Sequence, residues 1–559
     1  MAQTLDKATY DRLAQERITK SNIGAFDQLT VISQRAINGQ LAHMWKNPNS
    51  ILRKIDVRPS PKHPNEYYFT ADLGPPTVKL LTGPNKQQVV FFINIKSGKV
   101  GYYDGVGPDA EPKTADLGVS TLALRVNLAF DQLEANKVPK NVQDALKKPD
   151  DYSVKQLLFD FTTADLIPKL NGVDKDESKF DIAPEAEAPF YELLGKYLTA
   201  LRQKDPSGNV AEHNILHYVA TAKDAKNYTP APTCVPTDLN FQSLPFVIVD
   251  TDRTGTTGVL EGKNNMLVYL QMTDNRKMPN ALLEPTANWV MPPFDETSES
   301  YDGTVCLSKA TFLDGLLLPR LAQLNSDSTW VVDQAWWKSK DAGFSTEYNV
   351  YGHLGLTEED KKKDEFKNWQ WTLDSQKDGT RKYEYKKTHR IDDNDGLWRV
   401  YQEGRTTNTI SIPEGLDSSS KSVISLSGST EVETYLHLDG MGDWGKTTCI
   451  VKNTWEASLI LDGVDEGALQ VTVNNPKTNI SVTNDTSFLY PDILNPTKER
   501  VTNMFTNSPM NDIKADLQAM FSGSWSFVFS QGRDFFIDKA CFNNEGDLLG
   551  QLKYKSVGV

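Results

Sequence analysis

The chain has 559 residues, with 74 acidic and 60 basic side chains and a net charge of −14. This charge argues against a general binder of nucleic acid or of anionic membranes, because both require a basic footprint. A chain of this length buries large cores without disulfides or structural metals. The cysteines are few and far apart in the sequence, which favours a reducing compartment and gives no metal-ligand spacing.

The amino terminus is polar, and no stretch reaches the ~18 apolar residues of a membrane-spanning helix. We therefore expect a protein that is cytoplasmic as synthesised, without a signal peptide and with no transmembrane segment. Non-classical release and peripheral membrane contact remain open.

The chain begins with two predicted amphipathic helices. Ser33 is a typical cap for the second helix. Ile37, Leu41, Met44 and Trp45 follow at i, i+4, i+7 and i+8, so they share one face. This face either packs in an ordinary core, the default for such a stripe, or lines a groove for a hydrophobic ligand. These four residues are the candidate ligand contacts.

Strands and turns follow the two helices. Alternating apolar residues at 122–130 predict a strand with one buried face, and residues 307–324 predict a helix interrupted at Pro319. Two acidic, weakly apolar linkers divide the chain into three expected parts. These are an N-terminal half with the opening helix and hairpins (1–171), a helical and β segment (172–303), and a β-rich second half with C-terminal helices and closing strands (304–559).

The segment from Gly440 to Thr447 satisfies the phosphate-loop pattern. A nucleotide site of this kind needs a helix directly after Lys446, whose amino terminus faces the phosphates. The residues that follow, including Ile450 and Val451, are β-branched and favour a strand. A Gly-rich hairpin is therefore the preferred interpretation, and a nucleotide-binding enzyme is a remote alternative.

Two other patterns imitate metal sites. Asp250, Asp252 and Glu261 occupy calcium-loop positions, but strand-like residues flank them, so a solvated turn is expected. His213 and His217 are spaced like a zinc-binding pair on a helix, but no third ligand is near, so we expect a helix-surface pair without metal. The sequence contains no nucleophile elbow, and no Gly-x-Gly-x-x-Gly run stands in the strand-to-helix context that a dinucleotide site requires. We expect no enzymatic activity, no cofactor and no metal.

Basic and aromatic residues alternate between positions 361 and 390. Such a pattern can bind single-stranded nucleic acid by stacking and charge neutralisation. Acidic residues within the same segment dilute its positive charge. We therefore expect an exposed hairpin with an aromatic inner face and no nucleic-acid partner, and a protein-facing or membrane-facing patch remains open.

Six short segments, spread over most of the chain, carry a family resemblance. They are residues 26–33 (FDQLTVIS), 71–78 (ADLGPPTV), 91–103, 312–319, 525–529 (WSFVF) and 542–549 (FNNEGDLL). Their order resembles the tubular lipid-binding (TULIP) superfamily, in the branch of the clostridial neurotoxin-cluster accessory proteins and their microbial relatives.

The resemblance implies an α+β, β-rich fold in which long curved antiparallel sheets wrap around long helices, with extra β-rich segments. It implies an apolar groove that binds a lipid or another hydrophobic small molecule without chemistry. The alternative is a protein-interaction or toxin-accessory scaffold that holds a protein partner and no ligand.

Overall fold

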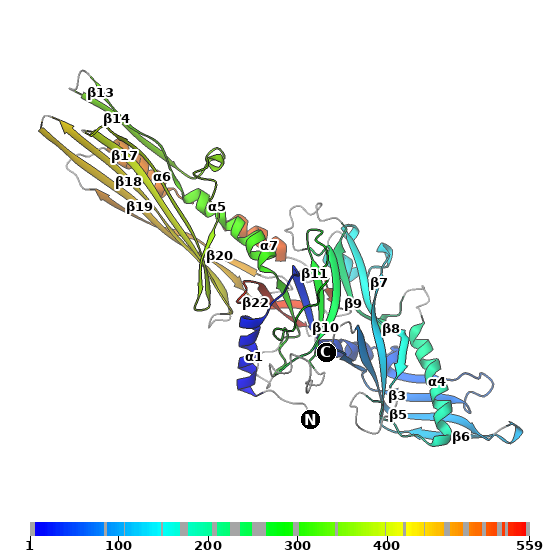
Figure 1. Cartoon of the computed structure of the whole chain (residues 1–559). Helices are drawn as coiled ribbons and strands as arrows, with labels where there is room; N and C mark the ends of the chain where they lie inside the picture. The colour runs from blue at the N-terminus through cyan, green and yellow to red at the C-terminus, as the bar shows by residue number, and fades with distance from the viewer. Residues whose placement is uncertain are drawn as a thin grey trace.

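The computed structural model describes residues 6–82, 87–105, 107–146, 149–167, 177–203, 210–223, 235–248, 264–293, 301–340, 345–396, 398–416, 421–440, 442–462, 470–484, 491–505, 510–521, 528–530 and 535–554. The molecule is elongated, with an N-terminal lobe and a second lobe on opposite sides of a central sheet (Figure 1). Both lobes consist of antiparallel sheets with helices against one face. The predicted β-rich α+β class, with long curved sheets around helices, is confirmed.

The N-terminal lobe contains a nine-stranded antiparallel sheet. Its main path runs through β2 (Lys54–Val57), β3 (Tyr68–Leu73), β5 (Gln88–Asp104), β7 (Ser120–Gln132), β8 (Tyr152–Leu166), β9 (Ile215–Ala222) and β21 (Val528–Ser530), while β4 (Thr77–Leu80) and β6 (Glu111–Leu117) pair with β5. Helices α2 (Gln34–Lys46) and α4 (Pro184–Arg202) pack against this sheet, and α3 (Lys140–Leu146) precedes β8. The sheet curls around α2 and α4, which fill its inner face.

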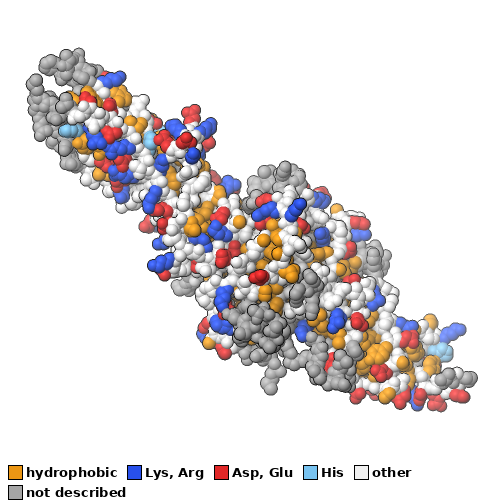
Figure 2. All heavy atoms as spheres, viewed as in Figure 1, with side chains coloured by type: hydrophobic (Ala, Val, Ile, Leu, Met, Phe, Trp, Pro, Cys, Tyr) orange, Lys and Arg blue, Asp and Glu red, His pale blue; other side chains and the backbone are white. Residues whose placement is uncertain are grey.

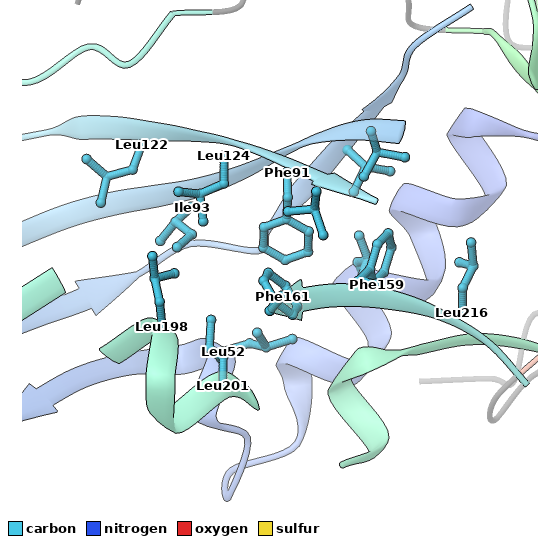
Figure 3. Packing of buried hydrophobic residues seen from close by; sticks show 14 of the residues in the cluster. Leu52, Phe91, Ile93, Leu122, Leu124, Phe159, Phe161, Leu198, Leu201 and Leu216 are labelled. Carbon is cyan, nitrogen blue, oxygen red and sulfur yellow. The ribbon is translucent and has the colours of Figure 1, made fainter. Parts of the chain in front are cut away.

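The inner face of this sheet follows the period-2 pattern of the sequence. Leu122 and Leu124 are 0% exposed, whereas Arg125 points to solvent, as the alternation in this strand predicts. Leu124 lies opposite Phe91 of the neighbouring strand. These side chains face Leu198 of α4 across the interior (Figure 3).

The central sheet has six strands in the order β10 (Asp238–Leu244), β11 (Met266–Met272), β1 (Gln28–Ser33), β12 (Gly303–Leu307), β23 (Leu548–Tyr554) and β22 (Phe535–Phe542). Helix α1 (Lys7–Lys20) buries Leu13 in the apolar cluster of this sheet. The strands come from all three expected sequence parts, so β1, from near the start of the described chain, and β23, from near its end, belong to one sheet, with β12 between them.

The second lobe is a meander of six strands in sequence order: β15 (Thr372–Lys377), β16 (Thr380–Asn394), β17 (Trp398–Pro413), β18 (Ser422–Gly440), β19 (Gly442–Asp462) and β20 (Gln470–Asn484). The hairpin of β13 (Trp330–Lys340) and β14 (Ser345–Leu354) packs against β16 and β17. The helices of this lobe are η8 (Ala310–Leu317), α5 (Leu318–Ser328), α6 (Pro491–Thr502) and α7 (Met510–Phe521). Short 3-10 turns occur at Ile51–Arg53, Gly107–Asp109, Ala135–Lys137, Pro149–Asp151, Glu212–Asn214 and Asp360–Lys362.

The predicted interruption at Leu318–Pro319 is a change of helix type. The segment η8 before it is a π-helix, and α5 begins at Leu318 as an ordinary α-helix. Leu317 and Leu318 keep right-handed helical dihedrals, so the backbone stays helical across the junction, and Pro319, which has no N–H to donate, lies in the first turn of α5. None of the described helices is both long enough and apolar enough to span a bilayer.

Candidate functional site

The candidate site lies where α2 packs between the curled N-terminal sheet and the central sheet. Ser33 caps the helix through its side chain. The amide of Asn38 pairs with Val78 of β4 like a strand, because Oδ1 accepts from the backbone N–H at 2.7 Å and Nδ2 donates to the carbonyl at 3.2 Å. Gln34 Oε1 accepts from the Leu80 N–H at 2.7 Å. Two side-chain amides of α2 thus hold it against the edge strand β4.

The four candidate ligand contacts on α2 lie at different depths. Ile37 is 0% exposed and Leu41 is 1% exposed, both within the largest apolar cluster of this lobe. Met44 and Trp45, one turn further along, are only half-buried against the same cluster. The helix therefore runs from the packed interior, at Ile37, to a partly open end, at Trp45.

The interior around Ile37 and Leu41 is apolar and aromatic. Phe91 makes edge-to-face contacts with Phe159 and Phe161, at centroid distances of 5.5 and 5.0 Å. Figure 3 shows these rings between the strands and the helices, with Leu198 and Leu201 of α4 on the opposite side. The described interior is filled by protein side chains.

At the partly open end, three half-buried apolar side chains pack against the interior cluster. These residues, called here the α2 rim, are Met44, Trp45 and Ile51. They lie on the last turn of α2 and on the 3-10 turn after it. The α2 rim makes the apolar interior continuous with the protein surface.

Trp45 has the most elaborate surroundings on the α2 rim. Its indole Nε1 donates to the Leu73 carbonyl at 3.2 Å. Lys96 Nζ lies 4.9 Å from the centroid of the Trp45 ring system, and Arg53 Cζ lies 5.2 Å from it. Both distances are typical of cation–π contacts. The tryptophan is therefore fixed in position with two cations beside it.

A separate depression of about 490 Å³ lies near the α2 rim, on the strands β2, β3, β5 and β6. Most of its side chains are polar, and they carry both signs of charge. The charged residues around it are Lys54, Asp56, Asp72, Lys99 and Asp116. These charged side chains distinguish the depression from the apolar α2 rim.

The prediction of a helix-surface histidine pair is wrong. His213 lies in a 3-10 turn and His217 lies in β9, where it is 0% exposed with Nδ1 2.7 Å from the Tyr269 hydroxyl oxygen. Burial lowers the pKa of His217 to about 3, so its ring is neutral at physiological pH. The apolar, β-branched run around His217 is buried on both faces as a strand, which overrides the helical spacing. Within the described ranges, no three His, Cys, Asp or Glu side chains are grouped to hold a metal ion.

The phosphate-loop pattern forms a hairpin, as the preferred interpretation predicted. Lys446 and Thr447 lie in β19 and pair with His437 and Leu436 of β18, so a strand follows the lysine. The helix that a nucleotide site requires is replaced by this strand. The calcium-like positions 250–261 lie outside the described residues.

The hairpin predicted in the basic and aromatic segment is present. β15 and β16 form a hairpin whose turn, Asp378 and Gly379, has φ values of 53° and 68°. Tyr383 and Tyr385 are each 4% exposed on the inner face. Acidic and basic side chains are interspersed over the visible face of the molecule (Figure 2).

No protein-family profile matches this chain, and no curated protein matches it. Solved structures with some similarity include P47 of Clostridium botulinum E1, with 13% identity and a TM-score of 0.38 over 95% of this chain and 99% of that one. P47 from Clostridium botulinum A2 has 14% identity and a TM-score of 0.37 over 96% and 98%. A lipopolysaccharide binding protein has 11% identity and a TM-score of 0.35 over 95% and 99%. All three TM-scores are below 0.5, so the similarity assigns this chain to neither a family nor a function.

Proposed function

We propose that this chain binds a lipid or another hydrophobic small molecule, without catalysing a reaction, between α2 and the inner face of the N-terminal sheet. The observation that carries the proposal is the continuity of the half-buried Met44 and Trp45 with the apolar interior. A hydrophobic molecule that reaches the α2 rim finds apolar side chains from the surface inwards.

Binding on this path requires α2 to move, because Ile37 and Leu41 fill the space that an acyl chain would occupy. Outside its apolar face, α2 is held by the amides of Gln34 and Asn38 on β4 and by Gln40, whose Nε2 donates to the Leu216 carbonyl at 2.7 Å. Each such hydrogen bond contributes about 1 kcal/mol. A chain of about twelve carbons gains roughly 10 kcal/mol when it is buried, which offsets these bonds together with part of the apolar contacts that Ile37 and Leu41 lose.

The second candidate is a protein-binding scaffold that carries no ligand. The complete burial of Ile37 and Leu41 favours it, because the described interior is packed without a ligand. The two candidates differ in what accompanies the purified protein.

Native mass spectrometry of the full chain, followed by organic extraction and lipid analysis, tests the proposal. We expect a lipid bound in stoichiometric amount, or one that binds when the apoprotein is exposed to mixed lipids. A matched pair of variants locates the site: Met44→Glu places a charge on the α2 rim and should abolish binding, whereas Leu373→Glu changes an exposed leucine of the second lobe and should not. An apoprotein that takes up no lipid would favour the scaffold.

A further inference from the structure

We propose that the ligand at the α2 rim has an anionic head group, which Arg53 and Lys96 bind beside Trp45. This inference rests on the proposed function and specifies the ligand class. The shared chemistry of such head groups is an oxyanion, a carboxylate or a phosphate, attached to an acyl or alkyl chain.

The first support is the position of the two cations. Arg53 ends the 3-10 turn after α2, and Lys96 lies in β5, yet both lie about 5 Å from the ring system of Trp45. The ring itself is half-buried against the apolar interior. An amphiphile whose chain follows Met44 inwards therefore leaves its polar end at the two cations.

The second support is the charge balance around Trp45. Neither Arg53 nor Lys96 forms an ion pair with any residue that the structure describes, and Lys46 and Lys54 nearby also form none within that part. Against these four cations stand two carboxylates on the adjoining strands: Asp56 is paired with Arg58, whose Nε lies 2.7 Å from it, and the exposed Asp72 lies opposite Lys54. The chain as a whole carries −14. A local surplus of unpaired cations on an acidic protein indicates a binding partner of negative charge.

The third support is the chemistry of the two side chains. The guanidinium of Arg53 is a planar fork that matches the two oxygens of a carboxylate or phosphate. Lys96 adds a point charge beside the same ring. Their contact with Trp45 restricts both side chains before a ligand arrives, which lowers the entropic cost of binding.

Isothermal titration with single-chain probes of equal length tests the head group. Decanoate and decyl phosphate carry a negative charge, 1-decanol carries none, and decyltrimethylammonium carries a positive charge. We expect the two anions to bind the full-length protein at least about fivefold more tightly than 1-decanol, with weaker binding as ionic strength rises. The tighter of the two anions identifies the head group as a carboxylate or a phosphate.

Two variants locate the effect. Arg53→Gln and Lys96→Gln should each weaken binding of the anion about two- to fivefold and leave binding of 1-decanol unchanged. Lys140→Gln, at an exposed lysine of α3, is the control and should change neither. Because 1-decanol carries no charge, its binding tests the hydrophobic site of the proposed function, and the difference between it and the anions tests the anionic head group.

Three results would contradict parts of this account. Equal affinity for 1-decanol and the anions, or the tightest binding by decyltrimethylammonium, overturns the anionic head group and leaves the proposed function standing. Anion preference that survives in the double Arg53→Gln, Lys96→Gln variant overturns the assigned residues. Absence of binding by all four probes overturns the proposed function itself.

Discussion

The two lobes share an architecture, an antiparallel sheet with helices on its inner face, but they fix their helices differently. In the N-terminal lobe, the amides of Gln34 and Asn38 bond to the edge strand β4, Gln40 bonds to the Leu216 carbonyl, and the remaining described side chains of α2 that face the core are apolar. In the second lobe, the end of α5 is bonded deep inside: Asn408 Nδ2 donates to Ser328 Oγ at 2.8 Å, and Thr430 Oγ1 donates to the Ser328 carbonyl at 2.5 Å. Both Asn408 and Thr430 are 0% exposed.

Because of this difference, we expect α2 to move away from its sheet more easily than α5 does. If α5 were lifted, buried polar groups would lose their hydrogen-bond partners. Each group left without a partner costs about 1–3 kcal/mol. Lifting α2 breaks the four hydrogen bonds of Gln34, Asn38 and Gln40, but most of the surface it exposes is apolar and can be covered again by an apolar ligand. The account therefore assigns ligand binding to the N-terminal lobe and a rigid role to the second lobe.

The largest expected effect tests the rigidity of the second lobe. A Cβ at Gly428 would stand 2.0 Å from Asn408 Oδ1 and 2.6 Å from Trp455 Nε1. Gly428→Ala should therefore lower the free energy of unfolding by about 3 kcal/mol, because the neighbours cannot separate without breaking the α5 contacts. Gly118→Ala is the control, since a Cβ there meets no atom within 4 Å. Urea unfolding measures both, and equal stability of the two variants would refute the rigid interior.

A cavity in the N-terminal lobe should be rescued by ligand. Leu41→Ala should cost about 3 kcal/mol of unfolding free energy, because it removes a fully buried side chain. Saturating 1-decanol should restore part of this loss, since a ligand that binds only the folded state stabilises it. Leu426→Ala, a comparable buried leucine of the second lobe, should cost a similar amount and show no rescue. Thermal unfolding with and without 1-decanol measures the stabilisation of each variant. Equal stabilisation of both would contradict a ligand site confined to the N-terminal lobe.

The buried hydrogen bonds of α5 give the next effect. Asn408→Ala should lower the free energy of unfolding by about 2 kcal/mol, because Asn325 Oδ1 and Ser328 Oγ lose a buried donor. Thr409→Ala, at the neighbouring half-buried position on the other face of β17, should change it by less than about 0.5 kcal/mol. If Asn408→Ala lowers the free energy of unfolding no more than Thr409→Ala does, the buried hydrogen bonds of Asn408 are not what fixes α5.

A pH effect of similar or smaller size should come from the N-terminal lobe. Burial lowers the pKa of His217 from 6.5 to about 3 in the folded protein, so the unfolded chain binds the proton first as pH falls. The contribution of His217 to the free energy of unfolding is complete above the pKa that histidine has in the unfolded chain. It decreases below that pKa, by about 2 kcal/mol between pH 7 and pH 5. His217→Asn should unfold with a shallower pH dependence over this window. An unchanged slope would contradict burial of a neutral histidine.

Much of the fold follows from local patterns, and the candidate site follows only in part. The alternation around Leu124 and the break at Pro319 predict a strand and a helix boundary because both signals depend on neighbouring residues. The α2 stripe places Ile37 and Trp45 on one face, but its spacing cannot show that one is sealed and the other half-open. That difference depends on how far the curled sheet and α4 extend over the helix.

Long-range contacts explain the rest. Arg53 and Lys96 carry no motif, and only the fold places both beside Trp45. His217 was misassigned to a helix because the spacing of two histidines is a weaker signal than the buried strand that contains one of them. The amides of Gln34 and Asn38 look like ordinary polar helix residues in the sequence, and their role depends on the edge strand β4.

The most direct test of the central claim is to lock α2 in place. Asn38 and Val78 are joined by two hydrogen bonds across the α2–β4 contact, so the double variant Asn38→Cys, Val78→Cys places two thiols across it, and a loss of two free thiols on oxidation shows that the disulfide has formed. Calorimetric titration of this variant with 1-decanol compares its oxidised and reduced forms. The account predicts binding by the reduced protein and none by the oxidised protein, because the ligand replaces side chains under α2. Equal binding by the two forms would contradict a ligand site beneath this helix.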